Sequence, residues 1–188
     1  MPQIPLVDQR LAYLREPSIT PSAATGKTFF SDNGGKPKYL CNRPRKVANS
    51  LPVTLLEPIF AAFVDDCQNY QPTSDDNNFV RQLSEQMSNA YDDELDRMKV
   101  FRQLLRDYAI ILDASMIGST KFVTDGHLLS RNGKFVEVIV EGKNEIGSTG
   151  ADPFAQCMVY YRKFMEASKE EIAGLRCVMP CIYIVVFG

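Results

Sequence analysis

The amino-acid sequence predicts an α/β fold in which helices flank a small mixed β-sheet. Between residues 52 and 108, apolar side chains recur with the spacing of amphipathic helices. Residues 135–143 and 181–187 are rich in β-branched and other apolar residues, which is typical of strands. A helical pattern over 154–171 separates these two segments. The expected order is therefore helix, hairpin strands, helix, strand.

Composition places the 188-residue chain among ordinary globular proteins, with 45% hydrophobic residues and a net charge of −2. A nucleic-acid ligand would need a local basic patch, because the chain as a whole is not basic. No apolar run approaches the roughly 20 residues of a membrane span. The segment 1–5 lacks the features of a secretory signal.

The cysteines favour an intracellular, reducing compartment, because there are five of them and they are widely scattered. A nucleus, including a host nucleus for an effector, is an open alternative. Cys177 and Cys181 are close in sequence, but His127 is the only histidine. Buried thiols are therefore favoured over a zinc site.

Residues 1–50 are expected to form an irregular arm, since they carry much of the proline, glycine and serine. The domain itself is expected over 51–188. Basic residues of the arm are candidates for contacting a nucleic-acid backbone, with a solvated loop as the alternative. These residues are Lys27, Lys36, Lys38, Arg43, Arg45 and Lys46.

Two helices are predicted next, an extra N-terminal helix over 52–70 and one long helix over 78–108, with a polar turn at 71–77. The apolar stripe of the long helix comprises Val80, Leu83, Met87, Tyr91, Met98, Phe101 and Leu105.

The period then changes to that of strands. Residues 121–124 are expected to form a strand and 125–133 a hairpin, in which Arg131-Asn132-Gly133 is the turn signal. Strand 135–143, a loop over 147–153, helix 154–171 and strand 180–187 follow. Because the sequence stops directly after an apolar strand, we expect a domain truncated at its C-terminal end or a module of something longer.

Glu141 and Lys143 are the anchor of the candidate chemistry. Residues two apart in a strand face the same side, so both project together, while Val136, Val138 and Val140 are expected on the opposite side. A carboxylate can hold a hard cation, and a lysine beside it can orient or activate a water. The alternative is a solvent-facing salt bridge on an edge strand.

Two further carboxylates are candidates for the same centre. The hairpin turn can bring Asp125 beside Glu141, although Asp125-Gly126 is also a common turn pair. Glu94 lies two turns from Met87 and Phe101 in the expected long helix, hence within its apolar stripe. The alternative places Glu94 at the rim, bonded to Arg97 or Arg102.

The helix that follows adds Gln156 and Tyr160, which share one face because they are four residues apart. Gln156 is a candidate for holding a water or the scissile phosphate, and Tyr160 for bracing it. His127 is a candidate for contacting phosphate or metal, with a turn histidine of no catalytic role as the favoured alternative. Together these residues suit metal-assisted hydrolysis of a phosphodiester, with Asp125, Glu141 and Glu94 as ligands of Mg²⁺ or Mn²⁺.

The set resembles the PD-(D/E)XK nuclease superfamily. Asp125 matches its first carboxylate, Glu141-Gly142-Lys143 its second motif, and Glu94 the acidic residue of the first core helix. Gln156 and Tyr160 resemble the Gln-x-x-x-Tyr element of RecB-type exonucleases, and Thr124 replaces the usual proline. The resemblance implies a restriction-endonuclease-like core and catalytic roles for Glu94, Asp125, Glu141, Lys143 and Gln156.

A closer likeness is to fungal Crinkler-like proteins, in which a nuclease-fold domain precedes a kinase-like domain. It rests on residues 87–94, 141–147 and 152–156. Two functions follow as hypotheses. One is a metal-dependent nuclease that cleaves DNA, or else RNA. The other is a catalytically degenerate binding or regulatory module of a larger kinase-containing or effector protein.

Overall fold

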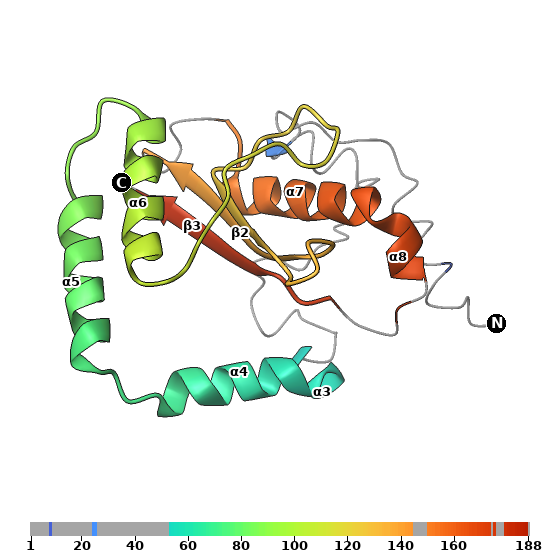
Figure 1. Ribbon diagram of the computed structural model, residues 1–188, viewed down its shortest axis with the longest axis horizontal. Helices are drawn as coiled ribbons and strands as arrows, with labels where there is room; N and C mark the ends of the chain where they lie inside the picture. Colours follow the sequence, from blue (N-terminus) through green and yellow to red (C-terminus); the bar gives the residue numbers. More distant parts are fainter. Residues whose placement is uncertain are drawn as a thin grey trace.

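The computed structural model describes residues 8, 24, 25, 53–144, 150–173, 175 and 179–187. The fold is mixed α/β, as predicted (Figure 1). Its elements in chain order are α3 (Val53–Leu56), α4 (Pro58–Asn69), α5 (Ser74–Met87), α6 (Glu94–Asp107), β1 (Gly126–Leu129), β2 (Val136–Lys143), α7 (Pro153–Ala167), α8 (Lys169–Ala173) and β3 (Ile182–Phe187).

The sheet has the order β1-β2-β3, so β2 is its central strand. β1 and β2 are antiparallel and form the predicted hairpin, in which Gly133 adopts a left-handed φ of 71°. β2 and β3 are parallel, with Glu141 opposite Val185, and α7 lies between them in the chain. The predicted mixed sheet is therefore confirmed.

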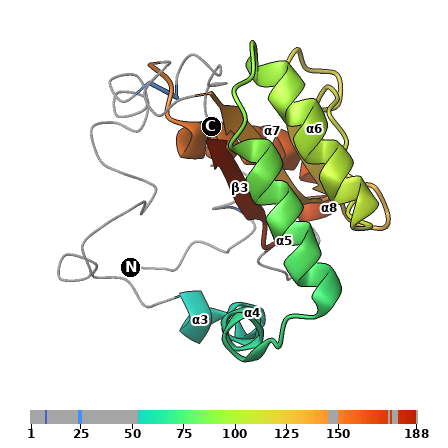
Figure 2. The same cartoon turned by 90° about the vertical axis from the view of Figure 1, so that its left-hand side faces the viewer.

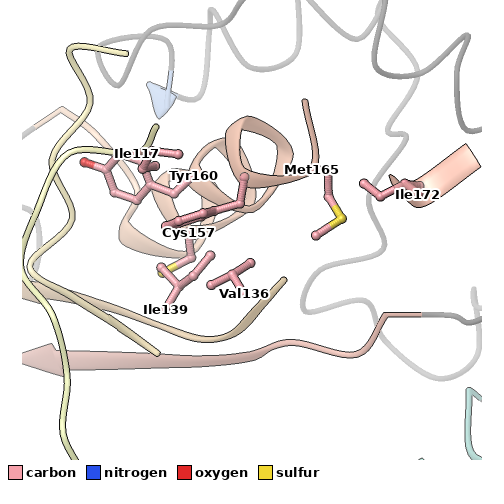
Figure 3. Packing of buried hydrophobic residues seen from close by; sticks show 8 residues of the cluster. Ile117, Val136, Ile139, Cys157, Tyr160, Met165 and Ile172 are labelled. Carbon is pink, nitrogen blue, oxygen red and sulfur yellow. The ribbon is translucent and has the colours of Figure 1, made fainter. Parts of the chain in front are cut away.

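The sheet is packed between two helices. On one face, α7 covers a cluster that includes Ile139, Cys157 and Tyr160 (Figure 3). On the other face, Met98 and Phe101 of α6 pack against Val140. The prediction that Val136 shares the face of Val138 and Val140 is wrong, because Val136 joins the α7-side cluster. A register shift at Leu128/Leu129 accompanies this change.

The single long helix predicted over 78–108 is also wrong. Helix α5 ends at Met87, and α6 starts at Glu94 with Asp93 as its N-cap. The Asp93 carboxylate accepts a hydrogen bond of 2.7 Å from the Asp96 amide, which satisfies a donor that an interrupted helix leaves open. The two helices pack side by side, as Figures 1 and 2 both show.

The strand predicted over 121–124 is not formed. Its residues lie in a loop closed by local bonds, with the Ile117 amide donating to the Phe122 carbonyl at 2.9 Å. Only an isolated bridge joins Met116 to Val123 there. The hairpin strand begins instead at Gly126, and His127 pairs with Asp113 on its outer edge.

The predicted N-terminal helix over 52–70 is present as α3 and α4, interrupted at Glu57 before Pro58. Its apolar side is exposed rather than packed on the sheet, because 74% of Leu55 and 53% of Ile59 and Phe63 are accessible. Figure 2 shows these helices set apart from α7 and the strands. Among the described residues, no helix has the length and apolar character needed to cross a membrane.

Two residues of the expected arm contact the domain. Thr25 forms a bridge with Ala151, and the Ala24 carbonyl accepts a 2.9 Å bond from the Asp152 amide at the start of α7. The candidate basic residues of the arm lie outside the described residues, as do Cys41 and Cys177.

Candidate active site

The predicted centre lies at the C-terminal end of the central strand. Glu141 and Lys143 occupy this end of β2 and are only 3% and 7% exposed. The arrowheads of β2 and β3 lie beside α6 in Figure 1. The alternative of a solvent-facing pair on an edge strand is excluded, because β2 has a neighbour on each side and both side chains are buried.

Lys143 joins two glutamates. Its Nζ donates to Glu141 Oε1 at 2.7 Å, to Glu94 Oε1 at 3.3 Å and to the Gly142 carbonyl at 2.8 Å. Burial lowers the pKa of this ammonium, but the hydrogen bond to Glu141 and the charges of both glutamates outweigh burial and raise it. Lys143 is therefore a charged, fixed donor at neutral pH.

Glu94 reaches the centre for a different reason from the one predicted. It is the first residue of α6, and its side chain is 35% exposed, so it does not lie within an apolar stripe. A carboxylate in this position is favoured by the helix dipole. The alternative partners Arg97 and Arg102 are not bonded to it, since its described ion pair is with Lys143.

Asp125 precedes β1 and is anchored to β2. Its Oδ2 accepts a 2.8 Å hydrogen bond from the Gly142 amide, and its carbonyl accepts one of 2.5 Å from Arg102 Nη1. The Asp125 carboxylate is therefore held at Gly142, the residue between Glu141 and Lys143 in β2. The hairpin thus brings the two carboxylates together, as the sequence predicted.

The pKa of Glu141 reflects its burial and its proximity to Asp125. Burial, followed by the charge of Asp125, raises its pKa from 4.5 to about 7, although the hydrogen bond from Lys143 acts in the opposite direction. Two carboxylates at one buried point repel each other unless a proton or a cation intervenes. The site therefore favours binding of additional positive charge.

Gln156 and Tyr160 lie together on α7 and are 8% and 5% exposed. Burial raises the pKa of Tyr160, as do the charges of Glu141 and Asp125, while a hydrogen bond from Gln156 opposes the rise. Tyr160 is thus a neutral phenol near the carboxylates. Gln156 Oε1 is buried and has no hydrogen-bond partner among the described residues, so it is free to accept one from a bound group.

His127 is buried in β1, where it pairs with Ile139 of β2. It is 3% exposed, its Nδ1 lies 2.7 Å from Thr124 Oγ1, and its ring is 4.9 Å from that of Phe164. Burial lowers its pKa, with the charge of Asp113 opposing, so the ring is neutral near pH 7. These contacts fix the ring against Thr124 and Phe164, and a contact of His127 with phosphate or metal stays a prediction.

The sequence did not reveal the role of Arg102, which was expected only as an alternative partner of Glu94. Its guanidinium fixes the backbone of Asp125 from α6. A bond to a main-chain carbonyl leaves no signature in the partner's residue type, so the motif spacing could not have identified it.

Comparisons with protein-family models, with curated proteins and with solved structures found no match. The geometry and chemistry of the site are therefore what indicates its function.

The donors present suit a hard divalent cation in kind. Asp125 and Glu141 offer carboxylate oxygens, which Mg²⁺ and Mn²⁺ prefer, and the unpartnered Gln156 Oε1 is an oxygen acceptor that could accept from a metal-ligated water. Within the described residues, however, no three acidic, histidine or cysteine side chains are grouped to hold a metal ion. Lys143 Nζ is ion-paired with both Glu94 and Glu141 instead, and it supplies one positive charge to the two carboxylates.

Proposed function

We propose that this chain is a metal-dependent nuclease with a restriction-endonuclease-like core, which hydrolyses phosphodiester bonds of DNA, or else of RNA. The observation that carries the proposal is the meeting of Asp125, Glu141 and Lys143 at the end of one central strand, with Glu94 from α6 bonded to the same lysine.

Each side chain has a distinct role in this proposal. Asp125 and Glu141, with Glu94 beside them, would hold Mg²⁺ or Mn²⁺. The bound cation would supply Lewis-acid stabilisation of the charge that develops on the phosphate. Lys143 is assigned to orient the attacking water. Its three N–H donors are engaged by Glu141, Glu94 and the Gly142 carbonyl. One glutamate would therefore exchange its bond to Nζ for the cation, which frees a donor for the water.

The helix α7 completes the site. The free Oε1 of Gln156 accepts a hydrogen bond from the water, and its amide is held by Tyr160. Three carboxylates repel a polyanion, so substrate binding depends on the cation and on basic residues elsewhere. Lys36, Lys38, Arg43, Arg45 and Lys46 are proposed for contacts with the nucleic-acid backbone.

Cleavage of nucleic acid by the purified protein tests this proposal. We predict that DNA or RNA is cut with Mg²⁺ or Mn²⁺ and not with EDTA, and that Lys143→Ala reduces the rate at least ~100-fold, because it removes a positioned charged donor. The matched control is Lys134→Ala. It removes a lysine that pairs with Glu171 on the surface, where the two side chains are 51% and 40% exposed. Undiminished cleavage by a folded Lys143→Ala protein would overturn the proposal.

A catalytically degenerate binding or regulatory module is the second candidate. It is favoured by the ion pairs that already neutralise Lys143 and by the absence of a three-ligand metal group within the described residues. On this alternative the module belongs to a larger kinase-containing or effector protein. Absence of cleavage, together with no metal-induced rise in melting temperature, would decide for it.

A further inference from the structure

Arg97 is a buried cation with no ion pair to any of the residues that the structure describes. It is 4% exposed, and Nε and Nη1 have no hydrogen-bond partner among the described residues. Its Nη2 makes one long bond, 3.4 Å to the Asn89 carbonyl, and its Cζ lies 5.1 Å from the centroid of the Tyr91 ring. Most N–H donors of this guanidinium are therefore unused.

The acidic residues nearest in sequence do not neutralise it. Glu94 pairs with Lys143, Asp96 pairs with Lys99 at 2.7 Å, and Asp93 caps the helix. A buried charge that lacks a partner costs several kcal/mol in proteins. A ligand that supplies the opposite charge would offset this cost.

The guanidinium lies at the catalytic end of α6. Helical side chains lean toward the N-terminus, and both contacts of Arg97, Asn89 and Tyr91, precede the helix. One turn earlier, Glu94 reaches Lys143. Directly after Arg97, Met98 packs against Gly142 of the Glu-Gly-Lys segment.

We propose that Arg97 binds a phosphate group of a nucleic acid beside the carboxylate centre. The inference rests on the proposed function, which supplies the polynucleotide. A guanidinium suits this ligand because its planar array of donors matches the oxygens of a phosphate. Nε and Nη1 are buried, so entry of the phosphate requires the Arg97 side chain or the residues around it to move. Asn89 and Tyr91 are its described contacts.

Fluorescence anisotropy with labelled oligonucleotides, in EDTA and again in Ca²⁺, tests the inference. Arg97→Met should weaken binding about tenfold or more and reduce the slope of log affinity against log salt by about one. The control Arg106→Met removes an exposed arginine of the same helix and should change affinity less than about twofold. Oligonucleotides with a 5′-phosphate and with a 5′-hydroxyl separate the sources: loss confined to the former identifies a terminal phosphate, and loss with both an internal one.

Stability provides a second readout. Without nucleic acid, Arg97→Met should melt at or above the wild-type temperature, because an unpaired buried charge has been removed. If that variant does not fold, Arg97→Lys takes its place; it keeps the charge, loses the planar donor array and should bind several-fold more weakly.

The outcomes separate this inference from the proposed function. Equal binding by wild type and the Arg97 variants, or no binding by wild type in either condition, overturns the inference. Cleavage by wild type together with unchanged binding by the variants overturns the inference alone. Arg97-dependent binding without any Mg²⁺- or Mn²⁺-dependent cleavage overturns the nuclease proposal and leaves the phosphate site standing.

Discussion

Glu141 is the residue whose environment departs most clearly from that of an ordinary surface carboxylate. It is buried, it faces the charge of Asp125, and its compensating partner is Lys143. These three relations depend on one another, because moving any of the three charges changes the protonation of the others.

The raised pKa of Glu141 predicts a pH dependence of stability in the metal-free protein. Between its ordinary value of 4.5 and its folded value of about 7, the folded state binds the proton more tightly than the unfolded state. The contribution of Glu141 to stability is therefore full below this window and is lost as pH rises through it, by at most about 3 kcal/mol. Urea denaturation in EDTA across this range, on wild type and Glu141→Gln, measures the effect. Parallel curves for the two proteins would contradict it.

Gly142 separates the two charged residues and lies against Met98. A Cβ at this position would be 2.8 Å from Met98 Cγ and closer still to its Sδ. We predict that Gly142→Ala lowers the free energy of unfolding by about 1–3 kcal/mol through overpacking.

The double variant Gly142→Ala/Met98→Ala provides the control for that prediction. Its loss in free energy of unfolding should be smaller than the sum of the losses in the two single variants, because the smaller side chain makes room for the new methyl group. Strict additivity in urea denaturation would show that the contact with Met98 is not the cause.

At the residue scale, the sequence indicated which residues lie at this centre better than it indicated how the fold places them there. Glu141, Lys143 and Asp125 could be found because strand alternation and a hairpin turn are local rules. Glu94 was named because of its expected place within one helix over 78–108, whereas it is the first residue of α6. Arg102 could not be found, because its partner is a backbone carbonyl.

The helix α6 is the element that organises the site. It carries Glu94 at its first residue, Met98 against Gly142, and Arg102 on the carbonyl of Asp125. The apolar spacing of Met87, Tyr91 and Met98 continues across the break before α6, so periodicity alone predicted one long helix. Asp93 was the available signal for a new start, because aspartate is a preferred N-cap.

The end of α6 offers a test of its local geometry. The Ile110 amide donates to the Leu105 carbonyl at 2.7 Å, and the Ala109 amide to that of Arg106 at 3.0 Å, which together form a Schellman motif. Ala109 has a φ of 66°, a conformation that favours glycine. We predict that Ala109→Gly raises the free energy of unfolding by up to about 1 kcal/mol, and that Ala109→Val lowers it. Thermal and urea unfolding of both variants measure the two signs, and a less stable glycine variant would refute this account of the helix end.

At the scale of the whole molecule, the candidate centre lies where the architecture favours ligand sites. β2 and β3 are parallel, and their C-terminal ends meet beside α6. Ligands of α/β sheets bind preferentially outside the carboxyl ends of such strands. The mixed sheet and its flanking helices followed from the apolar patterns, whereas the exposed position of α3 and α4 did not, because an amphipathic pattern does not identify the partner of its apolar side.

The central claim is that Asp125 and Glu141 bind a divalent cation. Anomalous diffraction from crystals soaked in Mn²⁺ tests it most directly. The proposed function predicts a Mn²⁺ peak bound by the carboxylates of Asp125 and Glu141, with Glu94 beside it, and no such peak in crystals of Asp125→Asn. Crystals that diffract well at saturating Mn²⁺, contain no peak at these carboxylates and retain the Lys143–Glu141 ion pair would contradict the claim.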